Sequence, residues 1–268
     1  MQGITPHSNA WYDRLSKQQD GYYYPWQSTL GLGDGESAYL SLVGDHLSKN
    51  TTVLDVGCGH GDVALELAPL CRSIVGYDRV ESYIQLAEKS RIDKKIPNVS
   101  FICHDSHQTA NEDHASIPVS ENSIDLVISR RGPTHWIEDA RRICRQGSSL
   151  IQLNPMGRKE EPDWNQALPE LLQLPSPARA DANSIVELIE ARLARAGLCI
   201  HSAWTFDVPE WFHKPVDLYK FLTFGEDSNS VPSWEEVEGD LERVFACYSG
   251  TKGLQDRQRR FLWKTTVS

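Results

Sequence analysis

The sequence predicts an α/β fold with a mostly parallel, doubly wound sheet, and the clearest support is one run of residues that begins at position 51. Residues 51–56 are mainly apolar and rich in β-branched side chains, which is typical of a buried strand. The strand leads into Gly57, Gly59 and Gly61, and then into a segment with helical spacing for which Asp62 is the expected N-cap. A strand, a glycine turn and a helix form the first half of a nucleotide-binding βαβ unit.

A second strand follows at the spacing that such a unit requires. Residues 73–78 are expected to form it, and it ends in Asp78, roughly 20 residues after the glycine turn, where an acid is placed to bind a ribose. A second glycine pattern, at residues 31–35, follows an aromatic stretch that Pro25 interrupts. We interpret that pattern as a turn before a helix rather than as a ligand loop.

The rest of the chain continues the alternation of strands and helices. Two capping boxes, at residues 184–187 and 233–236, predict helix starts, and five prolines between residues 154 and 180 predict an extended loop or lid. The further expected strands are residues 149–153, 198–206 and 260–267, and the expected helices are 81–90, 135–144, 184–197 and 234–248. The apolar face of the last helix is expected to consist of Trp234, Val237, Leu241, Val244, Phe245 and Tyr248.

Residues 55–61, Asp-Val-Gly-Cys-Gly-His-Gly, resemble the first motif of the class I S-adenosylmethionine-dependent methyltransferases, which reads acid-x-Gly-x-Gly-x-Gly. An acid ahead of the glycines suits a ligand that carries an ammonium and a sulfonium group. The resemblance is strong over residues 45–155 and implies S-adenosyl-L-methionine as the cofactor. It also implies a Rossmann-like, seven-stranded sheet whose last strand is antiparallel and lies between the fifth and the sixth.

The resemblance implies a division of the chain into three parts. Residues 1–50 would form an aromatic-rich extension or lid, residues 51–206 and 254–268 the cofactor-binding core, and residues 207–253 a helical insertion that shapes the substrate pocket. The rings of the extension have two interpretations: they close over the methyl donor and contact its sulfonium, or they pack the extension onto the core. These rings belong to Trp11, Tyr12, Tyr22, Tyr23, Tyr24 and Trp26.

The implied cofactor site lies at the ends of four strands, of which residues 99–106 resemble the third and residues 124–129 the fourth strand of the family. By the resemblance, Asp55 lies near the methionine end of the cofactor, Asp78 binds the ribose hydroxyls, and Asp105 meets the adenine amino group. The complete implied set is Asp55, Gly57, Cys58, Gly59, Gly61, Asp78, Arg79, Asp105, Ser106 and Ser129.

The segment after the strand at residues 124–129 is the best indication of the chemistry. It lacks the Asn/Asp-Pro-Pro-aromatic motif of enzymes that methylate exocyclic or amide nitrogens, and it lacks the acidic cluster that holds magnesium in catechol-type enzymes. Metal-independent transfer is therefore expected. His135 is the candidate base for an acceptor hydroxyl, with a structural role at a helix start as the alternative. Arg130 and Arg131 are candidates to bind a substrate carboxylate or phosphate, with ion pairs to neighbouring acids as the alternative.

Three histidines, His104, His107 and His114, lie close together in sequence but lack cysteine partners and a fixed spacing, so no metal site is expected there. The six cysteines form no Cys-x-x-Cys pair, which favours free thiols and a cytoplasmic protein. The apolar runs are too short to span a membrane, and the N-terminus lacks the pattern of a signal peptide.

The formal net charge of −10 favours a small-molecule acceptor over a nucleic acid, which needs a basic surface. Two alternatives stay open. An RNA methyltransferase would need a local basic surface made by Arg141, Arg142 and residues 257–260. A protein that binds the cofactor or its demethylated product without transfer would need no acceptor pocket.

Overall fold

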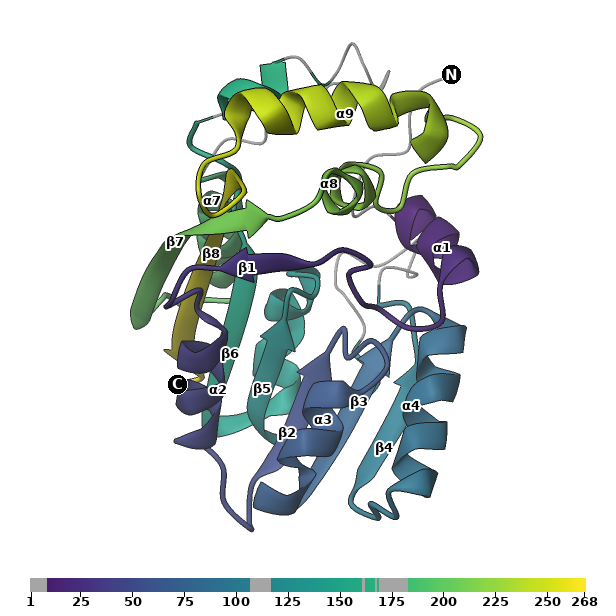
Figure 1. The fold of residues 1–268 in the computed structure, drawn as a ribbon. Helices are drawn as coiled ribbons and strands as arrows, with labels where there is room; N and C mark the ends of the chain where they lie inside the picture. The colour runs from purple at the N-terminus through teal and green to yellow at the C-terminus, as the bar shows by residue number, and fades with distance from the viewer. Residues whose placement is uncertain (1–8, 107–116, 161, 167, 169–182) are drawn as a thin grey trace. The chain divides into compact units, whose positions relative to one another are not determined.

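The computed structural model describes residues 9–106, 117–160, 162–166, 168 and 183–268, and it contains one eight-stranded sheet of order β1-β7-β8-β6-β5-β2-β3-β4 (Figure 1). The strands are β1 Ser28–Leu30, β2 Thr52–Val56, β3 Ser73–Asp78, β4 Val99–Cys103, β5 Ile124–Arg130, β6 Cys144–Pro155, β7 Ser202–Phe212 and β8 Leu254–Thr266. The α-helices are α1 Asn9–Gln18, α2 Glu36–Gly44, α3 Asp62–Leu67, α4 Glu81–Asp93, α5 Ala140–Ile143, α7 Ser184–Arg195, α8 Pro215–Leu222 and α9 Trp234–Tyr248. The 3₁₀ helices are η1 Ala68–Leu70, η2 His135–Asp139 and η3 Asp163–Gln166.

The predicted fold class is confirmed. The strands from β2 to β6 pair in parallel, and β8 is antiparallel to β6 and lies between β6 and β7. The sheet has one strand more than predicted, because β1 pairs with β7 at its edge. β1 comes from the aromatic-rich segment, where Pro25 lies just ahead of the strand rather than within it.

The chain forms two compact units. Unit 1 comprises residues 1–34, 156–183 and 207–259, and unit 2 comprises residues 35–155, 184–206 and 260–268. The strands β7 and β8 each pass from one unit to the other. Residues 35–50, the end of the predicted extension, belong to unit 2. The three functional parts expected from the sequence stay a prediction.

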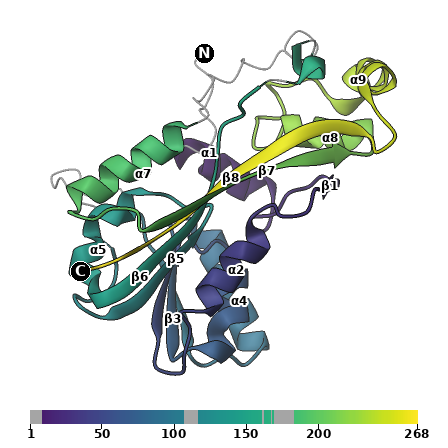
Figure 2. The same cartoon turned by 90° about the vertical axis from the view of Figure 1, so that its left-hand side faces the viewer.

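Unit 2 has the layers of a doubly wound domain. The helices α2, α3 and α4 cover one face of its sheet, and α5 and α7 lie on the other face (Figures 1 and 2). The core of the first face includes Tyr39 and Val43 of α2, Ile84 of α4 and Phe101 of β4. The central strands are buried on both sides, which explains their nearly continuous apolar sequences.

Three local predictions were wrong in ways that the backbone explains. Gly61, not Asp62, is the N-cap of α3, because Gly61 adopts the left-handed conformation that starts the helix. The strand expected at 198–206 runs from Ser202 to Phe212, where it pairs with β1. Tyr248 is 46% exposed at the end of α9, outside the apolar face that the other members form.

Unit 1 is held together by aromatic packing. Trp11 of α1 and Trp26 pack edge-on against Phe224, with ring centroids 5.5 and 5.3 Å apart. Tyr24 stacks on Trp26 at 4.6 Å. Several extension rings therefore pack within their own unit, against the segment that follows α8, and this packing supports the structural interpretation for them.

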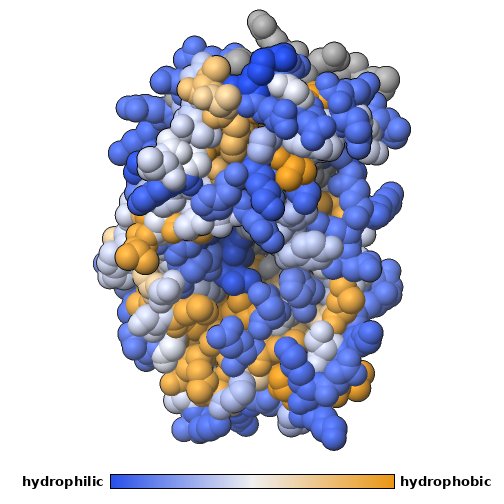
Figure 3. All heavy atoms as spheres, viewed as in Figure 1, coloured by the Kyte–Doolittle hydropathy of each residue, from blue (hydrophilic) through white to orange (hydrophobic). Residues whose placement is uncertain are grey.

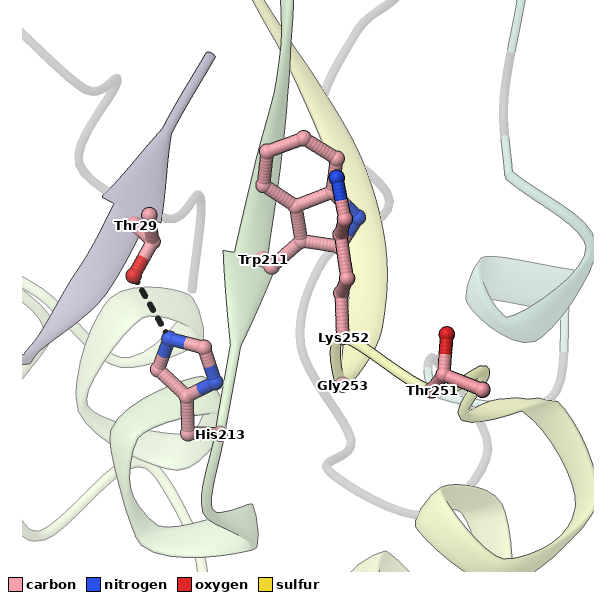
Figure 4. A pocket seen from close by; sticks show the side chains of 6 residues that line it. All are labelled: Thr29, Trp211, His213, Thr251, Lys252 and Gly253. Carbon is pink, nitrogen blue, oxygen red and sulfur yellow. Dashed lines mark hydrogen bonds between the residues drawn. The ribbon is translucent and has the colours of Figure 1, made fainter.

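Unit 1 also contains a pocket of about 470 Å³ lined by Thr29, Trp211, His213, Thr251, Lys252 and Gly253 (Figure 4). The Lys252 ammonium lies 4.7 Å from the centre of the Trp211 ring, and the Thr29 hydroxyl is 2.7 Å from Nε2 of His213. None of the predicted site residues lines this pocket.

Polar residues interrupt the apolar patches on the face shown in Figure 3. No helix in the described part of the chain is both long and apolar enough to cross a membrane. All six cysteines are free thiols.

Candidate active site

The strand ends carry most of the predicted site residues to one edge of the unit 2 sheet. Asp55 lies in β2, Asp78 is the last residue of β3, and Arg130 is the last residue of β5. Asp55 pairs with Gly76 of β3 and with Ile128 of β5 in parallel register, so the carboxyl ends of these strands share an edge. Ligands of open α/β sheets bind at this edge.

The glycine loop folds back over the neighbouring strand. Gly57, Gly59 and Gly61 have φ angles of 67°, 55° and 81°, a region in which residues with a side chain are strained. The N–H groups of Gly57 and Cys58 both donate to the carbonyl oxygen of Tyr77 at 3.0 Å. The loop therefore presents bare backbone at the carboxyl edge, as a ligand-binding loop requires.

We expect Gly61→Ala to destabilise unit 2 by about 2 kcal/mol or more. The positive φ costs about 1–2 kcal/mol for alanine, and the new Cβ would lie only 2.5 Å from Cζ of Phe101. Urea denaturation measures the loss. The matched control is Gly147→Ala, which has a similar φ of 85° but no atom within 4 Å of its Cβ. Equal losses in the two variants would contradict the steric part of this prediction.

Asp78 ties the end of β3 to the glycine loop. Its carboxylate accepts hydrogen bonds from the N–H of Gly59 at 3.0 Å and of Val80 at 2.9 Å. Burial raises the pKa of this carboxyl above its usual value, although the two N–H donors act to lower it. The side chain is half-buried, so solvent or a ligand reaches it.

Asp55 is buried, and one of its carboxyl oxygens is unsatisfied within the described structure. The residue is 3% exposed, and its Oδ2 atom has no hydrogen-bond partner among the described residues. Burial raises the pKa of the carboxyl to about 7, with further contributions from the charges of Asp62 and Asp78, while Arg130 opposes the shift. The hydroxyl of the fully buried Tyr39 also has no partner in the described structure. The sequence analysis did not identify Tyr39, because nothing in the sequence of α2 indicates that this side chain lies near Asp55.

Two further residues of the predicted cofactor site, Asp105 and Ser106, each make a side-chain hydrogen bond. Asp105 accepts from Nε of Arg79 at 3.3 Å. Ser106 is buried, and its hydroxyl is hydrogen-bonded to Nε2 of His135. The structure thus brings the predicted base, at the start of η2, into contact with a predicted cofactor-binding residue that follows β4.

Ser129 lies inside the sheet rather than at an open surface. It is completely buried, and its hydroxyl donates to the carbonyl oxygen of Val56 at 3.0 Å. Nε2 of Gln152 lies 3.3 Å from the same hydroxyl and donates to the carbonyl oxygen of Gly132 at 3.2 Å. In this position Ser129 fixes the backbone of the glycine loop and of the segment after β5.

A family model described as "Methyltransferase domain" matches residues 47–175, a span that holds the glycine loop, Asp78 and His135. The chain therefore contains a methyltransferase domain over just under half of its length. The predicted family is thereby confirmed.

Individual relatives of this chain are distant. It is 22% identical over 162 residues to the uncharacterized methyltransferase YcgJ of Bacillus subtilis, covering 58% of this chain and 60% of that protein. It is 30% identical over 121 residues to the Saccharomyces cerevisiae protein named "Probable S-adenosylmethionine-dependent methyltransferase CRG1", covering 42% of this chain and 38% of that protein. The chain thus spans less than two thirds of the length of both.

Solved structures show the same fold over most of the chain. The crystal structure of a functionally unknown protein from Deinococcus radiodurans matches with a TM-score of 0.65 at 20% identity, covering 96% of this chain and 99% of that one. The crystal structure of YcgJ matches with a TM-score of 0.56 at 15% identity, covering 87% and 99%.

The residues at the carboxyl edge of the unit 2 sheet fit S-adenosylmethionine, the cofactor that the predicted family implies. The bare glycine backbone leaves room for close approach, and the unpartnered Asp55 oxygen suits a cationic group. The half-buried Asp78 has acceptor capacity beyond the two N–H groups that it receives, which suits hydroxyl donors. Asp105, next to the end of β4, supplies a third acceptor at the same edge.

The two predicted arginines pair with acids of unit 2. Arg130 contacts Asp62 at 2.6 Å and Glu36 at 3.8 Å, and Arg131 contacts Glu36 at 3.0 Å. Arg260 also reaches Glu36 at 3.0 Å. Glu36 and the role of Arg260 beside it were missed by sequence reasoning, because the three elements that carry this group are far apart in the chain.

The predicted histidine group lies mostly beyond what the structure describes. His104 follows β4 and packs edge-on against Tyr77, whereas His107 and His114 lie outside the described residues. Within the described residues, no group of three or more histidine, cysteine or acidic side chains is arranged to hold a metal ion.

Proposed function

We propose that the protein transfers a methyl group from S-adenosyl-L-methionine to a small-molecule acceptor without a metal ion. The observation that carries this proposal is the buried carboxyl group of Asp55 beside a bare glycine loop, because its Oδ2 atom has no hydrogen-bond partner in the described structure and a cationic ligand would compensate its charge. When bound, the cofactor supplies a methyl group on a positively charged sulfur.

The residues of the chain mainly orient the two reactants. Asp55 would face the charged methionine end, Asp78 the ribose hydroxyls and Asp105 the adenine. Holding the donor at three points fixes the direction of its methyl group, and orientation alone supplies a large part of the rate enhancement in such a displacement. For a hydroxyl acceptor, the Ser106–His135 pair would take the proton.

The alternative of an RNA acceptor has less support, because the basic residues that it would use are already engaged. Arg142 contacts Asp139 at 2.6 Å, and Arg141 donates to the carbonyl oxygen of Gly197 at 2.8 Å. Arg257 contacts Asp207 at 2.7 Å. These contacts, together with the net charge of −10, favour a small acceptor.

The proposal is tested with S-adenosylmethionine that carries a labelled methyl group, incubated with the protein and a clarified cell extract. Products are separated by size and treated with nuclease or protease. We expect label in the low-mass fraction. Label in an RNase-sensitive fraction would establish the RNA alternative, and no transfer despite measured cofactor binding would favour a non-catalytic binding protein.

We expect His135→Gln to lower the rate of methyl transfer about 100-fold, the low end of the effect of a general base, without changing the affinity for S-adenosylhomocysteine. Labelled transfer and calorimetry measure the two quantities. His201→Gln is the control, since His201 belongs to the same unit and is exposed. A variant with unaltered rate would assign His135 the structural role that its contact with Ser106 also permits.

A further inference from the structure

The carboxyl edge of the unit 2 sheet is divided by charge. On the side of β2, β3 and β4 it carries the acids of the proposed donor site, Asp55, Asp78 and Asp105. On the side of β5, β6 and β8 it carries Arg130, Arg131 and Arg260. β8 is antiparallel to β6, and its Arg260 pairs with Pro155 at the end of β6, so register places Arg260 at the same edge as the other two arginines.

Three guanidinium groups converge on one carboxylate there. Oε1 of Glu36 lies 3.0 Å from nitrogen atoms of both Arg131 and Arg260, and Oε2 lies 3.8 Å from Arg130. The side chain of Arg260 is only 6% exposed, whereas that of Glu36 is 22% exposed. Arg130 makes its shorter contact with Asp62, at 2.6 Å, so Arg131 and Arg260 share the single charge of Glu36. Two guanidinium groups facing one carboxylate carry an excess positive charge that a second anion would offset.

The backbone at Arg131 adds a second, independent observation. Arg131 has a φ of 63°, a left-handed conformation that a residue with a long side chain rarely adopts. Its N–H donates to the carbonyl oxygen of Leu153 at 2.7 Å, which fixes the turn directly after β5. Strained residues of this kind concentrate at ligand sites, where the surrounding structure holds them.

We propose that the methyl acceptor carries a carboxylate or phosphate group, that Arg131 and Arg260 bind this group, and that Glu36 occupies their donors in its absence. This inference rests on the proposed function. An anionic group bound by the arginines is also kept apart from the acids of the proposed donor site, which would repel it. Guanidinium is the side-chain group best matched to the planar geometry of a carboxylate and to phosphate.

Binding of anions to the arginines is measured by calorimetry on protein saturated with S-adenosylhomocysteine. Because the cofactor site is then filled, the probes cannot bind in place of the cofactor's own carboxylate. The probes are benzoate, phenyl phosphate and the neutral benzamide. We expect saturable binding of at least one anion and none of benzamide. Stronger binding of benzoate would identify a carboxylate acceptor, and stronger binding of phenyl phosphate a phosphorylated one.

The variants separate a ligand site from a structural ion network. Arg131→Gln should weaken anion binding about tenfold or more, while Glu36→Gln should strengthen it several-fold because a competing carboxylate is removed. The matched control is Arg145→Gln, which breaks an ion pair with Asp125 of 2.7 Å at the opposite end of β5 and should leave anion binding unchanged. Equal dissociation constants in wild type, Arg131→Gln and Glu36→Gln, or equal binding of benzamide, would overturn the inference.

Transfer provides the second readout. The low-mass extract is divided on an anion-exchange resin, and each fraction is methylated with labelled donor. Label in the retained fraction, reduced in Arg131→Gln, supports an anionic acceptor. Label only in the unretained fraction overturns this inference but leaves the proposed function in place. No label in any fraction, with anion binding intact, overturns the proposed function and leaves the anion site supported by the titration.

Discussion

Replacement of Asp55 by asparagine is expected to stabilise the unliganded protein at pH 8 and to weaken its affinity for S-adenosylmethionine. Burial raises the pKa of the Asp55 carboxyl to about 7, whereas an aspartate in an unfolded chain has a pKa of about 3.9. Between these values the folded protein keeps a proton that the unfolded chain has released.

The sign of the pH dependence follows from this difference. Stability falls as the pH rises from about 4 to about 7 and levels off above 7, where the unfavourable contribution of Asp55 reaches the order of 4 kcal/mol. Asparagine has nearly the same shape and no charge, but its buried amide costs about 1–3 kcal/mol without partners. The variant should therefore gain a few kcal/mol at about pH 8 and little or nothing at about pH 5.

Urea denaturation at the two pH values tests the stability effect, and calorimetry tests the binding effect. In the wild type, S-adenosylmethionine should bind more tightly as the pH rises toward 7, because a cationic ligand prefers ionised Asp55; the variant should bind weakly with no such dependence. Asp125→Asn is the control. The Asp125 carboxylate accepts the N–H of Thr52 at 2.8 Å, at the other end of the strands, so its loss should lower stability and leave cofactor affinity unchanged. A pH dependence that persists in Asp55→Asn would assign it to another group.

Local sequence patterns were sufficient to predict the first two strands of the proposed cofactor-binding half of the sheet. The strand predicted at 73–78 coincides with β3, and that at 51–56 differs from β2 by one residue, because buried parallel strands have continuous apolar sequences with sharp ends. Asp62 failed as an N-cap because the αL conformation of Gly61 already starts the helix. The observed β7 differs from the predicted strand because β7 pairs with β1, and the paired residues Ser28 and Phe212 are too far apart in the chain for a local pattern to indicate the pairing.

The candidate site was predictable only where it follows strand ends. Asp55, Asp78 and Asp105 were found because each lies at or beside the end of a recognisable strand. The grouping of Glu36, Arg131 and Arg260 could not be predicted, because it depends on the start of α2, the turn after β5 and the register of β8 against β6. No local pattern specifies a register between strands so distant in sequence.

Replacement of Asp78 by alanine is expected to weaken the binding of S-adenosylhomocysteine roughly 100-fold, which corresponds to about 3 kcal/mol. The variant would lack the two charge-assisted hydrogen bonds that the Asp78 carboxylate is proposed to accept from the ribose, each contributing about 1.5–3 kcal/mol at most. It would also lose the N–H of Gly59 and of Val80, so the glycine loop should become less ordered in the unliganded protein. Calorimetry measures the affinity, and hydrogen exchange at Gly59 measures the order of the loop.

Two further variants separate these effects. Asp78→Asn keeps one carbonyl acceptor of nearly the same shape, so it should hold the loop better than alanine while still losing the charge. If the loop carried the whole effect, Asp78→Asn would bind S-adenosylhomocysteine almost as tightly as the wild type; if the ribose contacts carry it, both variants should be weakened. Asp125→Asn again serves as the control, because it removes a carboxylate that accepts a backbone N–H at the opposite end of the sheet. Unchanged affinity in Asp78→Ala would show that β3 does not deliver the ribose partner, and the placement of the donor along the acidic strand ends would have to be abandoned.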